Sequence, residues 1–333
     1  MKAIAASHGS ITVLPDLAVP APAKGHVLIR TEYSAISPGT ELTALRRSTD
    51  TTIELGYSAV GIVEQVGPEV ESLVPGQRVA CYGAPYVRHA ELMSVPVNLT
   101  AAVPDHVDPQ EAAFAGLGAI AIHALRVADL RFGERAIVVG LGILGNLLAQ
   151  IAAAASFVSL GYDRNAERVA RLQQCGVPHA YSDQVALERS LHELSEGYGA
   201  DGVLLCASGD GEKLINDSFT WIRDRGKIVI VGDITANFSR SAMFHKEAQV
   251  LISRAGGPGR YDPVYERQNQ DYPYGHVRWT EGRNTREYIR LLAEGRIRVK
   301  PLITGVYPMA DAKNAYDQHI QSPSTTIGTL LKF

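Results

Sequence analysis

Three glycines at fixed intervals are the clearest chemical feature of the chain. They stand in the run Gly140–Gly145 (GLGILG), directly after the apolar run Arg135–Val139 and before a helical pattern. In this context the first glycine allows a tight turn, the second lets backbone approach a pyrophosphate, and the third allows close helix–strand packing. The N–H groups that begin the helix then face the phosphates. We expect the residues of this dinucleotide site to be Gly140, Gly142, Ile143, Leu144 and Gly145.

An acidic residue stands where a ribose-binding carboxylate is expected. Asp163 follows the next strand pattern, Phe157–Tyr162, about 20 residues after the glycine-rich turn. Such a carboxylate binds ribose hydroxyls and repels a 2′-phosphate. The neighbouring Arg164 could stack on adenine or contact that phosphate. We therefore expect NAD as the cofactor, with NADP as the less favoured alternative.

A long irregular segment, residues 255–284, gathers hydrogen-bond donors and aromatic rings and is called the polar loop below. An irregular stretch of this length is uncommon in a compact domain and is usually functional. Arginine forks suit carboxylates, phosphates or vicinal hydroxyls. The alternative is a solvated loop or a subunit contact anchored by its tryptophan. If the loop reaches the site, the substrate is polar and polyhydroxylated or anionic. The substrate-binding candidates are Arg260, Tyr261, Arg278, Trp279, Arg283 and Asn284.

The composition excludes several classes of protein. Hydrophobic residues make up 46%, charged residues 20%, and the net charge is −3, so neither disorder nor binding to nucleic acid is expected. No apolar run reaches the roughly 18 residues of a membrane span, and the N-terminus lacks a secretion signal pattern. Three scattered cysteines exclude a disulfide framework. We expect a cytoplasmic protein without a membrane partner.

The pattern of elements divides the chain into two kinds of structure. Short strands broken by Gly and Pro fill the first hundred residues and are typical of a small β-barrel. An Ala-rich helix over residues 108–128 follows, with Asp108 and Glu111 at capping-box spacing. Strands then alternate with helices as far as Gln249–Ser253, which is typical of a doubly wound parallel sheet. A helix over Thr285–Gly295 and short strands close the chain.

Several stretches resemble the medium-chain dehydrogenase/reductase superfamily, and the resemblance covers essentially the whole chain. Beside the glycine-rich turn they are Gly61–Gly67 (GIVEQVG), Gly76–Ala80 (GQRVA) and His89–Glu91 followed by Val95-Pro96. The resemblance implies an α/β fold with a GroES-like β-barrel catalytic domain in residues 1–116. It also implies a Rossmann NAD(P)-binding domain in residues 117–254 and a return to the catalytic domain in residues 255–333.

A narrower branch of that superfamily is more similar still. It is often labelled zinc-binding dehydrogenase, and it includes the dehydrogenase halves of two-domain oxidoreductases and distant relatives of bacteriochlorophyllide dehydrogenase. The stretches that carry this resemblance are Ile36–Glu41 (ISPGTE), Leu55–Ser58 (LGYS), Gly83–Glu91 (GAPYVRHAE), Gly257–Asp262 (GPGRYD) and Asp271–Asn284 (DYPYGHVRWTEGRN).

The family's zinc ligands are missing from this chain. Zinc alcohol dehydrogenases hold the catalytic metal with a loop Cys, the His and Glu of a G-H-E motif, and a second Cys. Here the loop position is Ser37, the triplet reads Gly56-Tyr57-Ser58, and the second Cys falls at about Leu117. Hydroxyls and an aliphatic chain are not the ligands that zinc prefers. The four-Cys structural lobe expected after Cys81 is also absent, so we expect no metal.

Without a metal, a side chain must manage the alcohol's proton as hydride leaves for the nicotinamide. The resemblance implies four candidates: Thr40 at the family's proton-relay position, Glu41 beside it, Tyr57 in place of the zinc-binding His, and His89 on the substrate-pocket loop. Each has an ordinary alternative, namely a turn hydroxyl, a solvated or cofactor-orienting carboxylate, a packing ring and a structural imidazole. We expect His89 to carry the proton and Thr40 to relay it.

These features together predict a zinc-independent NAD(P)-dependent dehydrogenase acting on a CH–OH group. The substrate expected from the polar loop is a secondary alcohol of a sugar, cyclitol or similar metabolite. One alternative is reduction of a conjugated C=C bond, as in zinc-free quinone and enoyl reductases, and another is a non-catalytic nucleotide-binding protein. We also expect a homodimer, because relatives pair edge strands and Gln249–Ser253 is the apolar edge candidate here.

Overall fold

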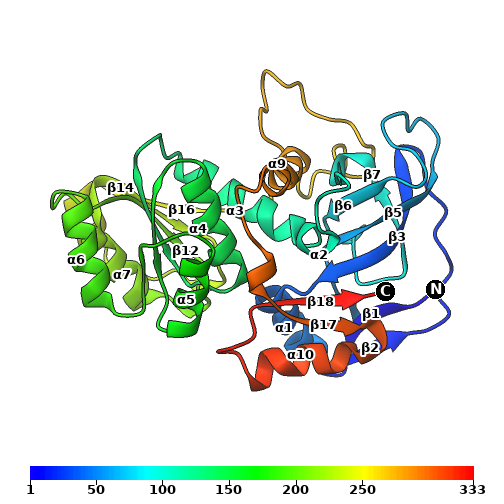
Figure 1. The fold of residues 1–333 in the computed structure, drawn as a ribbon, viewed down its shortest axis with the longest axis horizontal. Helices are drawn as coiled ribbons and strands as arrows, with labels where there is room; N and C mark the ends of the chain where they lie inside the picture. The colour runs from blue at the N-terminus through cyan, green and yellow to red at the C-terminus, as the bar shows by residue number, and fades with distance from the viewer. The chain divides into compact units, whose positions relative to one another are not determined.

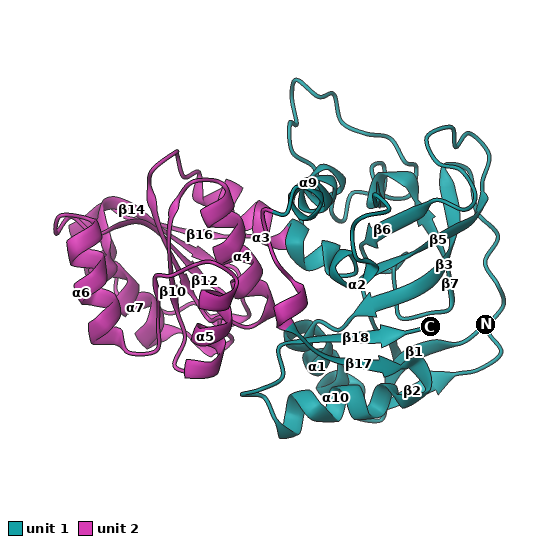
Figure 2. Ribbon diagram, in the orientation of Figure 1, with its two compact units in different colours: residues 1–119, 256–295, 303–333 teal, residues 120–255, 296–302 magenta.

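Segments far apart in the sequence combine into two units, drawn in different colours in Figure 2. The computed structural model describes residues 1–333. Unit 1 holds residues 1–119, 256–295 and 303–333, and unit 2 holds residues 120–255 and 296–302. The divisions lie at 119/120 and 255/256, close to the 116/117 and 254/255 expected from the sequence. The short segment 296–302, expected in the catalytic domain, belongs to unit 2.

Unit 2 is built on a six-stranded sheet in which every neighbouring pair is parallel. Its order is β11-β10-β9-β12-β14-β16, so the strand order reverses between β9 and β12. Ligands of such sheets bind outside the carboxyl ends of the strands at this reversal. The strands are β9 (Arg135–Val139), β10 (Val158–Tyr162), β11 (Ala180–Tyr181), β12 (Ala200–Leu205), β14 (Ile222–Ile230) and β16 (Gln249–Ile252).

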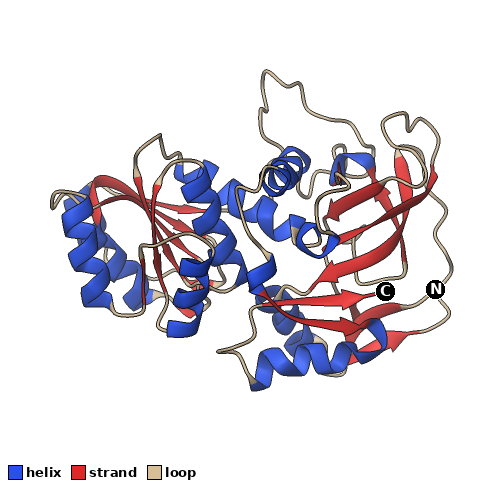
Figure 3. Cartoon of the chain, viewed as in Figure 1, coloured by secondary structure: helices blue, strands red, loops and turns tan.

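Helices lie on both sides of this sheet (Figure 3). Both faces of the central strands are therefore covered, and Ile137, Val203 and Ile228 are fully buried, which explains their continuous apolar sequences. The helices are α4 (Ile143–Ala154), α5 (Ala166–Gln174), α6 (Gln184–Leu194), α7 (Glu212–Trp221) and α8 (Arg240–Lys246). A two-stranded pair, β13 (Gly209–Asp210) and β15 (Ile234–Thr235), and the 3₁₀ turn η2 (Lys300–Leu302) complete the unit.

Unit 1 contains a seven-stranded sheet with the pairing order β17-β18-β3-β5-β6-β8, and β7 also pairs with β3. This β-rich sheet, with β7 added through β3, agrees with the GroES-like catalytic domain expected from the sequence. The strands are β3 (His26–Ala35), β5 (Ser58–Val66), β6 (Arg78–Tyr82), β7 (Leu92–Pro96), β8 (Thr100–Ala102), β17 (Ile303–Pro308) and β18 (Gly328–Lys332).

The C-terminal strand β18 joins the sheet of unit 1 by pairing antiparallel with β3 (Figure 1). A smaller sheet has the order β2-β1-β4, from β1 (Ala3–Ser7), β2 (Ser10–Leu14) and β4 (Ile53–Glu54). The remaining elements are α1 (Pro38–Arg47), α2 (Pro109–Ala112), α3 (Ala115–Ala128), α9 (Glu281–Ala293), α10 (Ala312–Gln321), η1 (Val97–Leu99) and η3 (Met309–Asp311).

Two predicted helices differ from the structure at their starts. The single helix over residues 108–128 is two helices, and Asp108 caps the first by accepting from the Gln110 amide rather than in a capping box. The helix expected over Thr285–Gly295 begins at Glu281 instead, because Thr280 accepts the Arg283 amide as an N-cap. The end of the predicted polar loop is therefore helical.

No helix of the structure is both long and apolar enough to cross a membrane.

Candidate active site

The glycine-rich turn lies between β9 and α4, at the reversal point of the unit 2 sheet. Gly140 has a φ of +89°, which disfavours any side chain. A Cβ on Gly145 would lie 1.8 Å from the Gly140 carbonyl oxygen, so the helix can pack this closely only with glycine. Gly142 is the N-cap of α4, has no side-chain cap, and faces space in which a Cβ meets nothing within 4 Å. Unpaired amides beside open space are the arrangement that a pyrophosphate requires.

Asp163 follows β10 and holds the glycine-rich turn in place. Its Oδ2 accepts the Leu141 amide at 2.8 Å, and its Oδ1 accepts the Asn165 amide at 2.9 Å. Arg168 lies 3.4 Å from the same carboxylate. Arg164 is exposed next to it. The carboxylate is thus fixed beside the turn, as a ribose-binding group must be.

The positions of the family's zinc ligands form hydrogen bonds of their own in unit 1. Tyr57 donates its hydroxyl to Ser37 Oγ. Ser58 accepts the Gly116 amide at 2.8 Å and donates to the Ala113 carbonyl at 2.6 Å, so it bridges the break between α2 and α3. The fourth position is the buried side chain of Leu117. These four side chains supply one phenol, two hydroxyls that already have hydrogen-bond partners within the protein, and an aliphatic group.

That donor set does not fit zinc, which prefers Cys, His and carboxylate ligands. No group of three or more His, Cys, Asp and Glu side chains is placed to hold a metal ion anywhere in the chain. Burial raises the pKa of Tyr57 well above its usual value, and the hydrogen bond with Ser37 only partly offsets this effect. The phenol therefore stays protonated and can act as a donor rather than as an anionic ligand or base.

His89, the predicted proton carrier, is fully buried in a network of side chains from four parts of unit 1. Its Nε2 lies 2.9 Å from Glu41 Oε2, and its Nδ1 lies 2.5 Å from Ser34 Oγ. Tyr316 of α10 also donates to Glu41 Oε2. The other carboxylate oxygen accepts the Ser37 amide at 2.9 Å. Both imidazole nitrogens are thus engaged, and Glu41 is 2% exposed.

Three of the four catalytic candidates lie close to Ser37, namely Thr40, Glu41 and Tyr57. They do not form a continuous chain of hydrogen bonds along which a proton could pass. Thr40 is exposed at the start of α1, and its hydroxyl is near enough to lower the Tyr57 pKa slightly. Tyr57 reaches Ser37 through side chains, whereas Ser37 reaches Glu41 through its backbone amide. A peptide N–H does not pass a proton on as a hydroxyl does. The Glu41–His89 pair therefore acts on the hydroxyls through position and charge.

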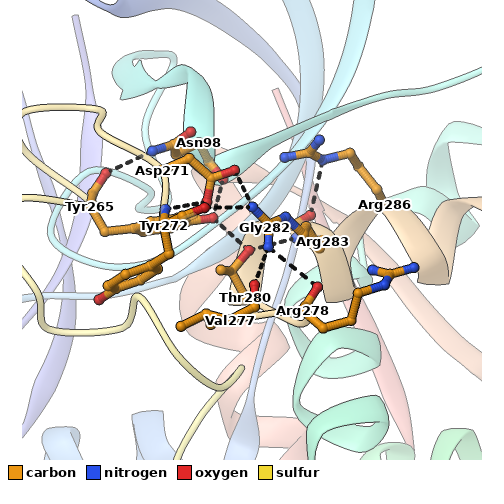
Figure 4. A network of polar contacts seen from close by, with 10 residues as sticks. All are labelled: Asn98, Tyr265, Asp271, Tyr272, Val277, Arg278, Thr280, Gly282, Arg283 and Arg286. Atoms are coloured by element: carbon orange, nitrogen blue, oxygen red, sulfur yellow. Dashed lines mark hydrogen bonds and ion pairs between the residues drawn. The ribbon is translucent and has the colours of Figure 1, made fainter. Parts of the chain in front are cut away.

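Three of the substrate-binding candidates use their polar groups in hydrogen bonds within unit 1. The Arg283 guanidinium binds Asp271 at 2.5 Å and the carbonyls of Val277, Arg278 and Tyr272, as Figure 4 shows. Asn284 is fully buried and donates to the Gly256 carbonyl at 2.8 Å. Arg260 pairs with Glu266 and donates to the Ala84 carbonyl at 2.7 Å. These contacts give the polar loop its shape.

The other three candidates are more accessible. Tyr261 is 59% exposed, and the Arg260 guanidinium covers one face of its ring at 4.1 Å. Arg278 is exposed and stacks on the partly exposed Trp279. The loop therefore divides into an inner set that fixes its backbone and an outer set that can meet a ligand.

Sequence reasoning missed Glu281, a buried carboxyl group of unit 1. The side chain is 0% exposed, and neither of its carboxyl oxygens receives a hydrogen bond from a donor. Burial raises its pKa to about 9, against the opposing effect of Arg260 and with a further rise from the Glu266 carboxylate. Protonated, it can donate to Glu266. No sequence signal marked it, because an acidic residue that begins a helix is normally exposed.

Comparisons with known proteins agree with this geometry. Residues 23–125 match the family model described as alcohol dehydrogenase GroES-like domain, and residues 142–269 match the model described as zinc-binding dehydrogenase. The chain is 25% identical to D-arabitol-phosphate dehydrogenase of Enterococcus avium, over 91% of this chain and 89% of that protein. It is 26% identical to D-xylulose reductase of Saccharomyces cerevisiae, over 84% and 81% respectively.

Solved structures share the fold over the whole chain. Galactitol-1-phosphate dehydrogenase from Escherichia coli superposes with a TM-score of 0.82 at 18% identity, covering 100% of both chains. A zinc-binding dehydrogenase structure from Sinorhizobium meliloti 1021 holds NADP and has a TM-score of 0.77 at 19% identity. An alcohol dehydrogenase from Escherichia coli CFT073 holds NADH and has a TM-score of 0.79 at 18% identity. In both of these comparisons the superposition covers 100% of this chain and 99% of the other chain.

The two family models together span most of the chain, one on each kind of sheet, and the glycine-rich turn is shaped for a dinucleotide. The chain therefore belongs to the zinc-type alcohol dehydrogenase-like medium-chain dehydrogenase/reductases and is an oxidoreductase acting on CH–OH groups.

Proposed function

We propose that the protein catalyses NAD(P)-dependent oxidation of a secondary alcohol in a polyol or sugar-derived metabolite, and the reverse reduction, without zinc. The named substrates of its relatives, arabitol phosphate and xylulose, support a polyol or its ketose. The observation that carries the proposal is the hydroxyl pair Tyr57–Ser37, which stands where zinc ligands would be. A protonated phenol there can hold the substrate oxygen by a hydrogen bond.

The cofactor is held by residues of unit 2 in this proposal. The first-turn amides of α4, opened by Gly142, bind the pyrophosphate, and Asp163 binds the ribose hydroxyls. When bound, the nicotinamide supplies the hydride acceptor or donor. The Asp163 carboxylate disfavours a 2′-phosphate, so NAD is the proposed cofactor. The side chain of the neighbouring Arg164 is exposed to solvent.

The alcohol is held by residues of unit 1. Tyr57 and Thr40 orient the hydroxyl, and the exposed Thr40 passes its proton to solvent. The buried Glu41–His89 pair acts on these hydroxyls through position and charge. This assignment modifies the expectation for His89 alone, because its nitrogens are already engaged by Glu41 and Ser34. The outer residues of the polar loop, Arg278 and Trp279, bind the remaining polar groups of the substrate.

A nicotinamide absorbance screen tests the proposed function. Sugar alcohols are offered with NAD⁺ or NADP⁺, and the corresponding ketoses with NADH or NADPH, at several pH values. Turnover of at least one secondary alcohol or ketose, faster with NAD than with NADP, is the expected result. Turnover confined to enones or quinones, or no hydride transfer to any member of the set, contradicts it.

We also propose that two copies pair through β16, the edge strand of the unit 2 sheet. Its outer side has no strand partner, and Ile252 is 71% exposed there. Sedimentation at micromolar concentration should give a dimer, and Ile252→Lys should give monomers. A monomer of the unchanged protein contradicts this. The cytoplasmic location expected from the sequence stays a prediction.

A further inference from the structure

The guanidinium of Arg278 lies over two aromatic rings on the polar loop. Its central carbon lies 3.7 Å from the ring centre of Trp279 and 4.5 Å from that of Tyr274. Tyr274 is 57% exposed and Arg278 itself is exposed, so the stack is open to solvent. Stacking uses the faces of a guanidinium and leaves the N–H groups at its edge available. The two ring contacts therefore restrict the guanidinium while its N–H groups stay available.

Those donors have no partner within the protein. No hydrogen bond or ion pair joins the Arg278 guanidinium to another residue, whereas the nearby Arg283 and Arg260 guanidinia each bind a carboxylate and a backbone carbonyl. The backbone of Arg278 is also fixed, because its carbonyl accepts from Arg283 at 3.3 Å (Figure 4). A guanidinium that is oriented but unpaired is prepared for a ligand at little further cost in side-chain entropy.

The charged residues around Arg278 do not neutralise the positive charge of its guanidinium. Of the four acidic residues in the segment 255–286, only Asp262 is both charged and without a cationic partner. Glu266 pairs with Arg260, Asp271 pairs with Arg283, Asp262 accepts the Tyr272 hydroxyl, and burial keeps Glu281 protonated at neutral pH. Arg267 and Arg286 of the same segment have no ion pair either. The local field therefore favours an anion.

We propose that the stack formed by Arg278, Tyr274 and Trp279 is an oxyanion-binding subsite and that the substrate is a polyol carrying a phosphate or carboxylate group. An oxyanion with two coplanar acceptor oxygens matches the guanidinium edge in a bidentate pair. This inference rests on the proposed function for the polyol part of the ligand, and it adds the anionic group that the proposed function leaves open.

Binding measurements on the whole chain test this without any need for turnover. The ligands are D-arabitol, D-arabitol 5-phosphate, D-arabinonate and inorganic phosphate, and the affinities come from calorimetry. The protein has two tryptophans, and Trp221 is buried in unit 2 with 1% exposure, so a change of emission in Trp221→Phe reports on Trp279. The phosphorylated polyol or the sugar acid should bind about tenfold or more tightly than arabitol. Whichever of the two binds better identifies the oxyanion.

The variants separate this subsite from general charge effects. Arg278→Gln should remove the preference for the anionic ligand, and Arg278→Lys should keep only part of it, because a lysine offers no planar fork. The matched control is Arg290→Gln, an exposed arginine already paired with Glu287 and Glu294, which should keep the full preference.

Three results overturn the inference. They are equal affinities for arabitol and its anionic derivatives, a preference that survives in Arg278→Gln, and binding of inorganic phosphate without preference among polyols, which indicates an adventitious ion only. Failure of the proposed function is distinguishable from these results. Arg278-dependent binding without hydride transfer contradicts the proposed function alone, whereas hydride transfer to neutral polyols with no anion preference contradicts this inference alone.

Discussion

His89 Nε2 and Glu41 Oε2 lie 2.9 Å apart, and the two side chains are 0% and 2% exposed. The same carboxylate oxygen accepts the Tyr316 hydroxyl, and the second imidazole nitrogen meets Ser34. A buried polar group whose partner is removed loses its hydrogen bond without gaining water. The pair therefore influences the stability of unit 1 as well as the chemistry at the neighbouring Tyr57.

His89→Ala should lower both stability and turnover. Removing the partner of a buried carboxylate costs about 1–3 kcal/mol. Disturbing the proton transfer that the pair supports should lower turnover by up to roughly 10²–10⁴-fold. His89→Gln can still donate to Glu41 and should recover most of the stability while remaining slow. Thermal unfolding and the pH dependence of kcat separate the two effects. A fully active and stable His89→Ala protein would show that the pair has neither role.

Gly142→Ala and Gly145→Ala should affect the nucleotide site in different ways. A Cβ on Gly145 collides with the Gly140 carbonyl oxygen at 1.8 Å, so this variant should lose both stability and cofactor binding. A Cβ on Gly142 meets no protein atom within 4 Å, so this variant should fold normally but bind cofactor weakly. Gly39→Ala, also free of contacts within 4 Å, is the control. Calorimetric titration with NADH and thermal unfolding give the answer, and normal binding by Gly142→Ala would refute this site.

Asp163→Ser should relax the choice between NAD and NADP. The substitution removes the charge that repels a 2′-phosphate, so the ratio of NADPH to NADH affinity should rise. It also removes the acceptor of the Leu141 and Asn165 amides, so both affinities should fall. Asp163→Asn keeps most of that geometry and serves as the control for it. If the unchanged protein binds NADPH more tightly than NADH, the assignment of Asp163 is wrong.

The nucleotide site could be predicted because its signals are local. The strand, the glycine spacing and the carboxylate of Asp163 lie within one short stretch, and parallel sheet geometry decides their arrangement. The expected order of strands and helices in unit 2 is therefore confirmed. The pairing of β18 with β3 in unit 1 could not be predicted from local pattern, because β18 comes from the far end of the chain. Only the resemblance to a known family implied this return.

The candidate alcohol site depends on contacts that no spacing reveals. Tyr316 meets Glu41 from 275 residues away, and it was never a sequence candidate. Arg283 was expected to face a ligand. Because Thr280 caps α9 earlier than expected, Arg283 lies in the first turn of that helix, and its guanidinium donates to carbonyls of the loop backbone. Glu281 was overlooked for the same reason, since its burial follows from where the helix begins.

Glu281→Gln should make the protein more stable at alkaline pH. The Glu281 pKa is raised from 4.5 to about 9 in the folded protein, so between these values the folded state holds a proton that the unfolded state has lost. The free energy of unfolding then falls as pH rises, by up to about 1.4 kcal/mol per pH unit. Glutamine cannot ionise, so the gain in stability should grow from pH 5 to pH 9.

Urea unfolding at several pH values measures the effect of Glu281→Gln, and the exposed Glu193→Gln is the control that should show no such trend. A stability difference that stays constant with pH would mean that Glu281 is not protonated in the folded protein.

The most direct test of zinc-independent dehydrogenase activity combines metal content with turnover in one preparation. Elemental analysis gives the zinc bound per chain, and nicotinamide absorbance follows oxidation of the best polyol before and after treatment with a chelator. We predict far less than one zinc per chain and a rate that the chelator leaves unchanged. One tightly bound zinc per chain, whose removal abolishes turnover and whose return restores it, would contradict the account.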